Sequence, residues 1–139
     1  MKLSKGMKIE KQPWKEQYKI NCTQAERDFP AMPETYTIVH YERNGKDIFQ
    51  DWLDSLRDFQ GRNAIQKRID RIEDGNFGEH RPCRDSVLEL VINTGPGYRV
   101  YYSIVENVIV LLLCAGDKSS QQKDINKAID YLKDFKERN

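Results

Sequence analysis

The pattern of apolar and polar residues predicts one folded unit that begins near residue 35 and continues to the C-terminus. Thr35–Tyr41 is rich in β-branched and aromatic residues and predicts a first strand. Three further strand-like runs follow at Val87–Ile92, Tyr98–Val105 and Val108–Cys114. Turn sequences separate these runs at Gly95–Gly97 and Glu106–Asn107, so we expect an antiparallel meander.

Helical periodicity predicts two helices between the first strand and the meander. Asp47 and Gln50 are spaced as a capping box after the Asn44-Gly45 turn. The expected apolar stripe of the first helix is Ile48, Phe49, Trp52, Leu53, Leu56 and Phe59. Gly61 is expected to stop this helix.

The second helix is predicted from about Arg62 to Asp74, with Gly75 as its C-terminal cap. Its inward residues are Ile65, Ile69 and Ile72. Together the two helices predict a helical hairpin. Its outer face carries four basic residues that either remain solvated or form part of a binding surface: Arg62, Lys67, Arg68 and Arg71.

A last helix is predicted after the meander. Ser119 and Gln122 are spaced as a second capping box, and the helix is expected to reach about Phe135. Its apolar face is Ile125, Ala128, Ile129, Leu132 and Phe135. The order strand, helix, helix, three strands, helix predicts an α+β domain over residues 35–139, with helices packed on one face of the sheet.

The register of the meander predicts where the single arginine of its middle strand points. A three-residue loop at Gly95–Gly97 pairs Arg99 with Asn93, and the following turn pairs it with Cys114. Side chains alternate between faces along a strand. Arg99 therefore shares a face with Asn93, Val91, Glu89, Tyr101 and Ser103, whereas the more apolar set around Val100 faces the core.

Composition narrows the class of protein. The 139 residues are 38% hydrophobic and 32% charged, with a net charge of +1, so overall charge does not predict a nucleic-acid partner. Three widely spaced cysteines without metal-site spacing favour a reduced cytoplasmic compartment. No apolar run is long enough to cross a membrane.

Residues 1–34 are predicted to be a basic extension that ends in a stiff Pro-containing linker. They contain seven Lys or Arg and five Asp or Glu, an excess of two positive charges. The extension is either a solvated tail or a segment that docks on the domain through Trp14, Tyr18 and Ile20.

A set of short motifs between about residues 35 and 135 resembles the RelE/ParE toxin superfamily, in its HigB-like, phage-derived branch. The motifs, in order, are Tyr41-Glu42-Arg43-Asn44-Gly45, Trp52-Leu53, Gly75-Asn76-Phe77-Gly78, Glu89-Leu90, Gly95-Pro96-Gly97-Tyr98-Arg99-Val100-Tyr101-Tyr102, and Gly116-Asp117-Lys118-Ser119-Ser120-Gln121 with Asp124-Ile125 and Ala128. One departure is Val91, because this branch commonly has an arginine after Glu-Leu.

The resemblance implies a RelE-like fold and the toxin of a type II toxin–antitoxin pair, acting in the cytoplasm. RelE-like and HigB-like members cut messenger RNA, usually on the ribosome, without a metal or cofactor. The alternatives are a ParE-like inhibitor of DNA gyrase and a toxin fold that has lost its chemistry and only binds. The expected partners are a cognate antitoxin and mRNA on the ribosome.

The resemblance places the site on a concave sheet face and carries the family's arginine and its basic position after the sheet over to Arg99 and Lys118. In metal-free RNA cleavage the 2′-hydroxyl attacks phosphorus, so cations must stabilise the charge that develops on phosphate. Arg99 fits this role, and Lys118 can reach the same phosphate. Tyr101 is expected to stack on a base, while Glu89 and His80 are the candidate bases. Alternatively, Arg99 forms an ion pair with Glu89 or Glu106.

The remaining candidate RNA contacts, besides the four on the second helix, are Arg81, Arg84 and Asn93. Val91, Tyr101, Val110 and Leu112 are expected to make the face around Arg99 apolar. Something should therefore cover part of it. The antitoxin is the expected cover, and the N-terminal extension is the rival.

Overall fold

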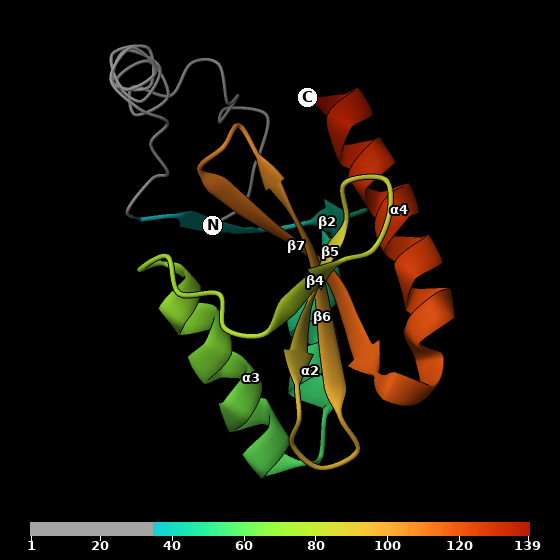
Figure 1. Cartoon of the computed structure of the whole chain (residues 1–139). Helices are drawn as coiled ribbons and strands as arrows, with labels where there is room; N and C mark the ends of the chain where they lie inside the picture. The colour runs from blue at the N-terminus through green and yellow to red at the C-terminus, as the bar shows by residue number, and fades with distance from the viewer. Residues whose placement is uncertain (1–34) are drawn as a thin grey trace.

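A five-stranded sheet in the order β1-β7-β6-β5-β4 is the centre of the fold in the computed structural model, which describes residues 35–139 (Figure 1). Its strands are β1 (Thr37–His40), β4 (His80–Pro82), β5 (Leu88–Ile92), β6 (Tyr98–Val105) and β7 (Ile109–Asp117). β1 runs parallel to β7, and every other neighbouring pair is antiparallel. The predicted N-terminal extension lies outside the described residues.

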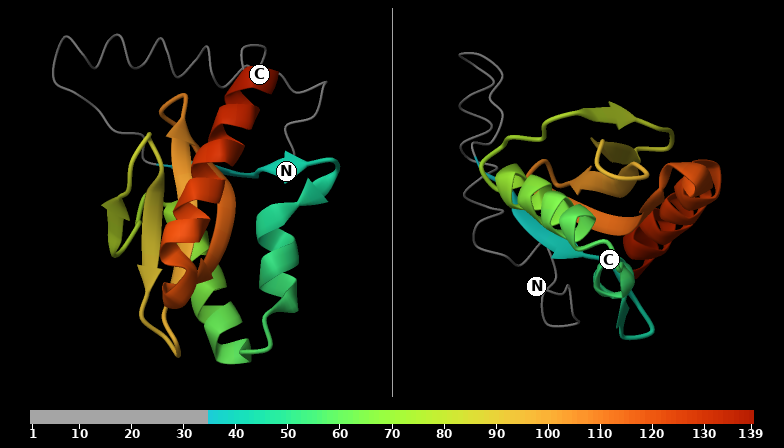
Figure 2. Two further views of the ribbon diagram at one scale, coloured as in Figure 1. Left: turned by 90° about the vertical axis from the view of Figure 1, so that its right-hand side faces the viewer. Right: turned by 90° about the horizontal axis from the view of Figure 1, so that it is seen from below.

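Helices cover both faces of this sheet (Figure 2). The helical elements are α2 (Ile48–Ser55), α3 (Phe59–Ile72), the short 3-10 helix η2 (Lys118–Ser120) and α4 (Gln121–Arg138). α2 and α3 pack on the face that carries Val100 and Tyr102. α4 packs on the other face, over Tyr101, Leu111 and Leu113. A two-stranded hairpin, β2 (Glu42–Arg43) and β3 (Lys46–Asp47), joins β1 to α2.

The predicted α+β class is confirmed, but the sheet is mixed rather than a pure antiparallel meander. The prediction that all helices pack on one face is wrong. β7 explains why, since it is apolar on both sides. Val110 and Leu112 face α2 and α3, whereas Leu111 and Leu113 face α4. A central strand with two apolar faces needs a covering layer on each.

The junction between α2 and α3 differs from the prediction. α2 ends at Ser55, and Gly61 lies inside the first turn of α3, where Asp58 Oδ1 accepts its backbone N–H at 3.0 Å. A Cβ on Gly61 would lie only 2.6 Å from Tyr98 Cε2. Residue 61 must therefore be glycine for Tyr98 to pack against the start of the helix. Phe59 is 70% exposed and does not belong to the apolar stripe.

The start of α4 also differs from the predicted capping box of Ser119 and Gln122. Asp117 Oδ1 accepts the backbone N–H of Ser119 at 2.9 Å, and a 3-10 turn leads into the helix at Gln121. An aspartate that caps the preceding turn replaces the expected serine because the chain leaves β7 through Lys118–Ser120 before the α-helix begins.

The predicted registers of the β5–β6 and β6–β7 pairs are both wrong, with different consequences. The loop between β5 and β6 spans residues 93–97, so Arg99 pairs with Val91 and Glu89 with Tyr101, two residues from the predicted pairing. An even shift keeps every side chain on its predicted face. On β7, Leu112 pairs with Tyr102 instead of Tyr101, an odd shift, and a β-bulge follows between Tyr101 and Tyr102. Val110 and Leu112 are therefore on the opposite face from the one predicted.

Candidate functional site

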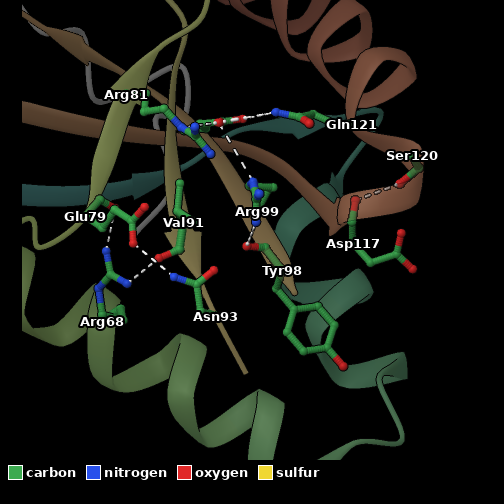
Figure 3. A network of polar contacts seen from close by, with 11 residues as sticks. Arg68, Glu79, Arg81, Val91, Asn93, Tyr98, Arg99, Asp117, Ser120 and Gln121 are labelled. Atoms are coloured by element: carbon green, nitrogen blue, oxygen red, sulfur yellow. Dashed lines mark hydrogen bonds and ion pairs between the residues drawn. The ribbon is translucent and has the colours of Figure 1, made fainter. Parts of the chain in front are cut away.

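Arg99 lies where β6 is flanked by β5 and β7, on the face that α4 covers. Its cross-strand partners are Val91 and Gly116. The residue is only 5% exposed, so the expectation that Arg99 stands on an open sheet face is wrong. α4 begins after β7 and the short helix η2, and Figure 3 shows Gln121 of its first turn reaching toward this region.

Glu89 is the centre of the polar contacts around Arg99. Its Oε2 atom lies 3.1 Å from Arg81 Nε and 3.8 Å from Arg99 Nε. Gln121 Nε2 donates to the same carboxylate, with distances of 3.0 and 3.3 Å to its two oxygens. Figure 3 shows Arg81 of β4 and Gln121 of α4 reaching toward one point, with Arg99 beneath them. The Arg99–Glu89 ion pair, one of the alternatives from the sequence, is thus present.

Arg99 is incompletely satisfied in this arrangement. Its Nη1 donates to the Tyr98 carbonyl at 3.2 Å, but its buried Nε has no hydrogen-bond partner among the described residues. A buried donor without an acceptor costs about 1–3 kcal/mol. The guanidinium is therefore held by charge more than by hydrogen bonds, and it retains capacity to bind an anionic oxygen.

Lys118 lies close to Arg99, and Gly97 of the β5–β6 loop contacts both residues. Its backbone N–H donates to the Gly97 carbonyl at 2.9 Å. A Cβ placed on Gly97 would be 3.7 Å from Lys118 Cβ and 3.9 Å from Arg99 Nη1. Gly97 also has a φ of +87°. The structure thus places an exposed lysine close to a buried guanidinium.

The start of α4 contributes groups that the sequence did not predict as part of the site. Besides Gln121, Asp124 is buried and accepts from Ser120 Oγ at 2.5 Å. Both belong to the motif that carried the resemblance, but nothing in the sequence showed that Gln121 would contact Glu89. That contact depends on how α4 crosses the sheet.

Tyr101 is fully buried beneath α4. Its hydroxyl has no hydrogen-bond partner among the described residues, and burial raises the pKa of its phenol. The expectation that Tyr101 stacks on a base is wrong for this structure, because both ring faces are enclosed by the core. Cys83 is also near Glu89; burial and that carboxylate raise the pKa of its thiol to about 11, so the thiol is protonated at neutral pH.

His80 is not part of the Arg99 cluster. It begins the edge strand β4 rather than lying on a loop, and it pairs with Leu90, which faces α2 and α3. Its Nδ1 lies 2.9 Å from the Gly78 carbonyl, and its ring contacts Phe77. Because Glu89 and Arg99 point to the opposite face, the structure separates His80 from both.

Arg68 supports the fold rather than presenting a free cation. It donates to the carbonyls of Val91, Phe77 and Glu79 at 2.6, 2.9 and 2.8 Å. Figure 3 shows it with Asn93 and Glu79 in a group separate from Arg81 and Gln121. Asn93 Nδ2 donates to Glu79 Oε1 at 3.0 Å. Neither residue reaches Arg99 in this structure.

The other predicted RNA contacts fall into two groups. Arg62, Lys67 and Arg71 lie on α3, on the far side of the sheet from Arg99; Arg62 pairs with Asp54 at 3.9 Å. Arg81 and Arg84 lie near the candidate site, where Arg81 contacts Glu89 and Arg84 donates to Asn126 of α4. Only this second group extends the basic surface around Arg99.

Within residues 35–139, no three His, Cys, Asp or Glu side chains are grouped so as to hold a metal ion. None of the helices described there has the length and apolar character needed to cross a membrane.

Comparison with known proteins identifies a relative but no characterised function. No family model matches the chain. An uncharacterized protein of Haemophilus influenzae is 45% identical over 80 residues, which cover 58% of this chain and 81% of that protein. Identity at this level over most of the relative shows common descent. The chain therefore belongs to the same family as this uncharacterized Haemophilus influenzae protein.

Proposed function

We propose that this protein is the toxin of a type II toxin–antitoxin pair and that it cleaves messenger RNA on the ribosome, with a RelE-like domain. The proposal combines the resemblance of residues 35–135 to HigB-like toxins with the cationic cluster at Arg99. In this reading Arg99 stabilises the negative charge that develops on phosphate, and Lys118 positions the same phosphate.

One observation carries the proposal: an incompletely satisfied buried guanidinium lies beside an exposed lysine. Arg99 Nε has no hydrogen-bond partner among the described residues, and Gly97 separates Arg99 Nη1 from Lys118 Cβ. Guanidinium groups bind phosphate oxygens through paired N–H donors, whereas lysine acts as a movable point charge. Such a combination suits a phosphodiester that must be both bound and stabilised as it reacts.

Glu89 is the candidate acceptor for the proton of the attacking 2′-hydroxyl, because it is the described carboxylate in contact with Arg99. The hydroxyl proton must move to a base, and the leaving 5′-oxygen must receive a proton. Lys118 is exposed and lies close to Arg99, so it is assigned to that second transfer. His80 has no role in this scheme since it faces the other side of the sheet.

The test is inducible expression of the full chain in a bacterial host. We expect translation to stop and primer extension on abundant messages to reveal cuts within reading frames. Lys118→Ala should reduce the cuts, whereas Lys123→Ala, an exposed lysine on α4, should not. Arrest with intact messages and a DNA-damage response would instead support gyrase inhibition.

A second function, a toxin fold that only binds, is favoured by a specific observation. Glu89 already neutralises Arg99 and Arg81, and Val91 stands where the branch commonly has a further arginine. The same expression experiment separates the two functions, because a binding module leaves both translation and messages intact.

The proposed protein partner is an antitoxin encoded beside the toxin. α4 packs over Tyr101 and its neighbours, so these apolar side chains are not exposed and do not indicate a partner. The resemblance supports this partner. Co-expression tests it: cells whose growth is arrested by this protein should grow again when the product of the adjacent gene is expressed with it.

A further inference from the structure

We propose that Glu89 occupies the phosphate subsite of the Arg99 cluster in the free protein and is displaced when a phosphodiester binds. The site is thus masked by the chain's own carboxylate. That the natural anion is RNA rests on the proposed function, whereas the masking itself rests only on the contacts of Glu89.

Glu89 makes the contacts that an anionic ligand would make. Its carboxylate faces two guanidinium groups, Arg81 and Arg99, and an amide donor from Gln121. Three elements far apart in the sequence, β4, β6 and α4, supply these donors. Carboxylate and phosphate oxygens bind guanidinium with the same geometry, so one can replace the other at this position.

The fit of Glu89 to Arg99 is loose. The distance from Glu89 Oε2 to Arg99 Nε is 3.8 Å, whereas a charge-assisted hydrogen bond is about 2.7–2.9 Å long. The Arg99 Nε proton is consequently left without an acceptor in a buried position. A phosphate group, with more oxygens than a carboxylate and no tether to β5, can approach Arg99 more closely.

The exposure of the side chains in the cluster indicates how a phosphate replaces the Glu89 carboxylate. The side chains of Arg99 and Glu89 are 6% and 4% exposed, but that of Arg81 is 53% exposed. An incoming phosphate meets Arg81 first and competes with Glu89 for it. Release of Glu89 then also requires loss of its hydrogen bonds from Gln121. Gln121 therefore stabilises the state in which Glu89 occupies the phosphate subsite.

The direct test is Glu89→Gln in the full chain, with Glu79→Gln as the matched control. Both changes remove one negative charge, but Glu79 is exposed and contacts Asn93 instead of Arg99. The probes are inorganic phosphate, followed by NMR, and a fluorescent 2′-O-methyl RNA, which cannot be cleaved, followed by anisotropy. We expect Glu89→Gln to bind both about tenfold more tightly than Glu79→Gln, equivalent to about 1.4 kcal/mol.

A second variant keeps the test decisive if Glu89→Gln does not fold. Gln121→Met retains the size of the side chain and removes its donor, so Glu89 should leave more easily and phosphate should bind more tightly. Gln122→Met, at an exposed neighbouring position, is its control. Equal or weaker phosphate binding by Glu89→Gln, or by Gln121→Met if that is the only folded variant, would overturn the proposal.

These measurements are independent of cleavage. If the wild type cuts no message but Glu89→Gln binds phosphate more tightly, the proposed function fails and the masking stands. If messages are cut but Glu89→Gln gains no affinity over its control, the function stands and the masking fails.

Discussion

Gly116 lies directly across the β6–β7 ladder from Arg99, and the Asp124 carboxylate occupies the space that a side chain on Gly116 would fill. A Cβ there would be 2.0 Å from Asp124 Oδ2 and 2.8 Å from Ser120 Oγ. The absence of a side chain at residue 116 is therefore what lets the first turn of α4 approach β7 beside Arg99.

Gly116→Ala should destabilise the protein by about 1–3 kcal/mol, the usual cost of overpacking, and should displace the start of α4. The measurement is urea unfolding followed by circular dichroism. In an Asp124→Ala background the carboxylate is gone, so the added methyl group should cost less. An equal cost in both backgrounds would show that the close approach to Asp124 is not the cause.

Arg99→Lys should reduce message cleavage about 10²–10³-fold, because one fixed donor to the developing charge is lost and lysine cannot replace its planar fork. Arg99→Ala is a poorer test, since it leaves the buried Glu89 with one fewer cation and can destabilise the fold. The rate should be measured by primer extension, with the unfolding free energy as the control.

Tyr101→Phe should leave cleavage unchanged and increase stability by about 1 kcal/mol, because it removes a buried hydroxyl without a hydrogen-bond partner. Tyr98→Phe is the matched control. The Tyr98 hydroxyl donates to Asp58 Oδ2 at 2.8 Å, so its removal should destabilise the protein by about 1 kcal/mol. A large fall in cleavage by Tyr101→Phe would show that the hydroxyl takes part in the reaction.

Arg68→Met should loosen the segment 77–79 and the end of β5 without weakening RNA binding. Arg68 donates to three carbonyls there, and hydrogen bonds from charged groups are each worth about 1.5–3 kcal/mol. Hydrogen exchange should increase at residues 77–80 and 91. Lys67→Met, on the exposed side of α3, should change neither exchange nor stability.

Stability should fall in alkali as Tyr98 ionises. Burial, followed by the hydrogen bond to Asp58, raises the pKa of Tyr98 from 10.0 to about 12. The folded state therefore holds the phenolic proton more tightly than the unfolded state. This contribution is complete below pH 10 and is lost as the pH rises toward 12. Urea unfolding at a series of pH values should show this slope, and Tyr98→Phe should reduce it.

Local pattern was sufficient for the strands of the meander and for the inward face of α3. The strands lie within a few residues of their predicted positions, and Ile65, Ile69 and Ile72 are buried as expected. The turn at Glu106–Asn107 has φ values of +56° and +65°. These features depend on neighbouring residues, whose periodicity and turn chemistry are visible in the sequence.

The sequence by itself determined which residues could form a site: an arginine and a glutamate on one face of a sheet, and a lysine just after the last strand. Only the tertiary structure decided that Glu89 would bind Arg99 and Arg81, that Tyr101 would be buried, and that His80 would face away. The physical reason is that these outcomes depend on one bulge, two extra loop residues and the crossing of α4. Each changes how segments far apart in the chain pair, and local sequence patterns do not predict such pairings.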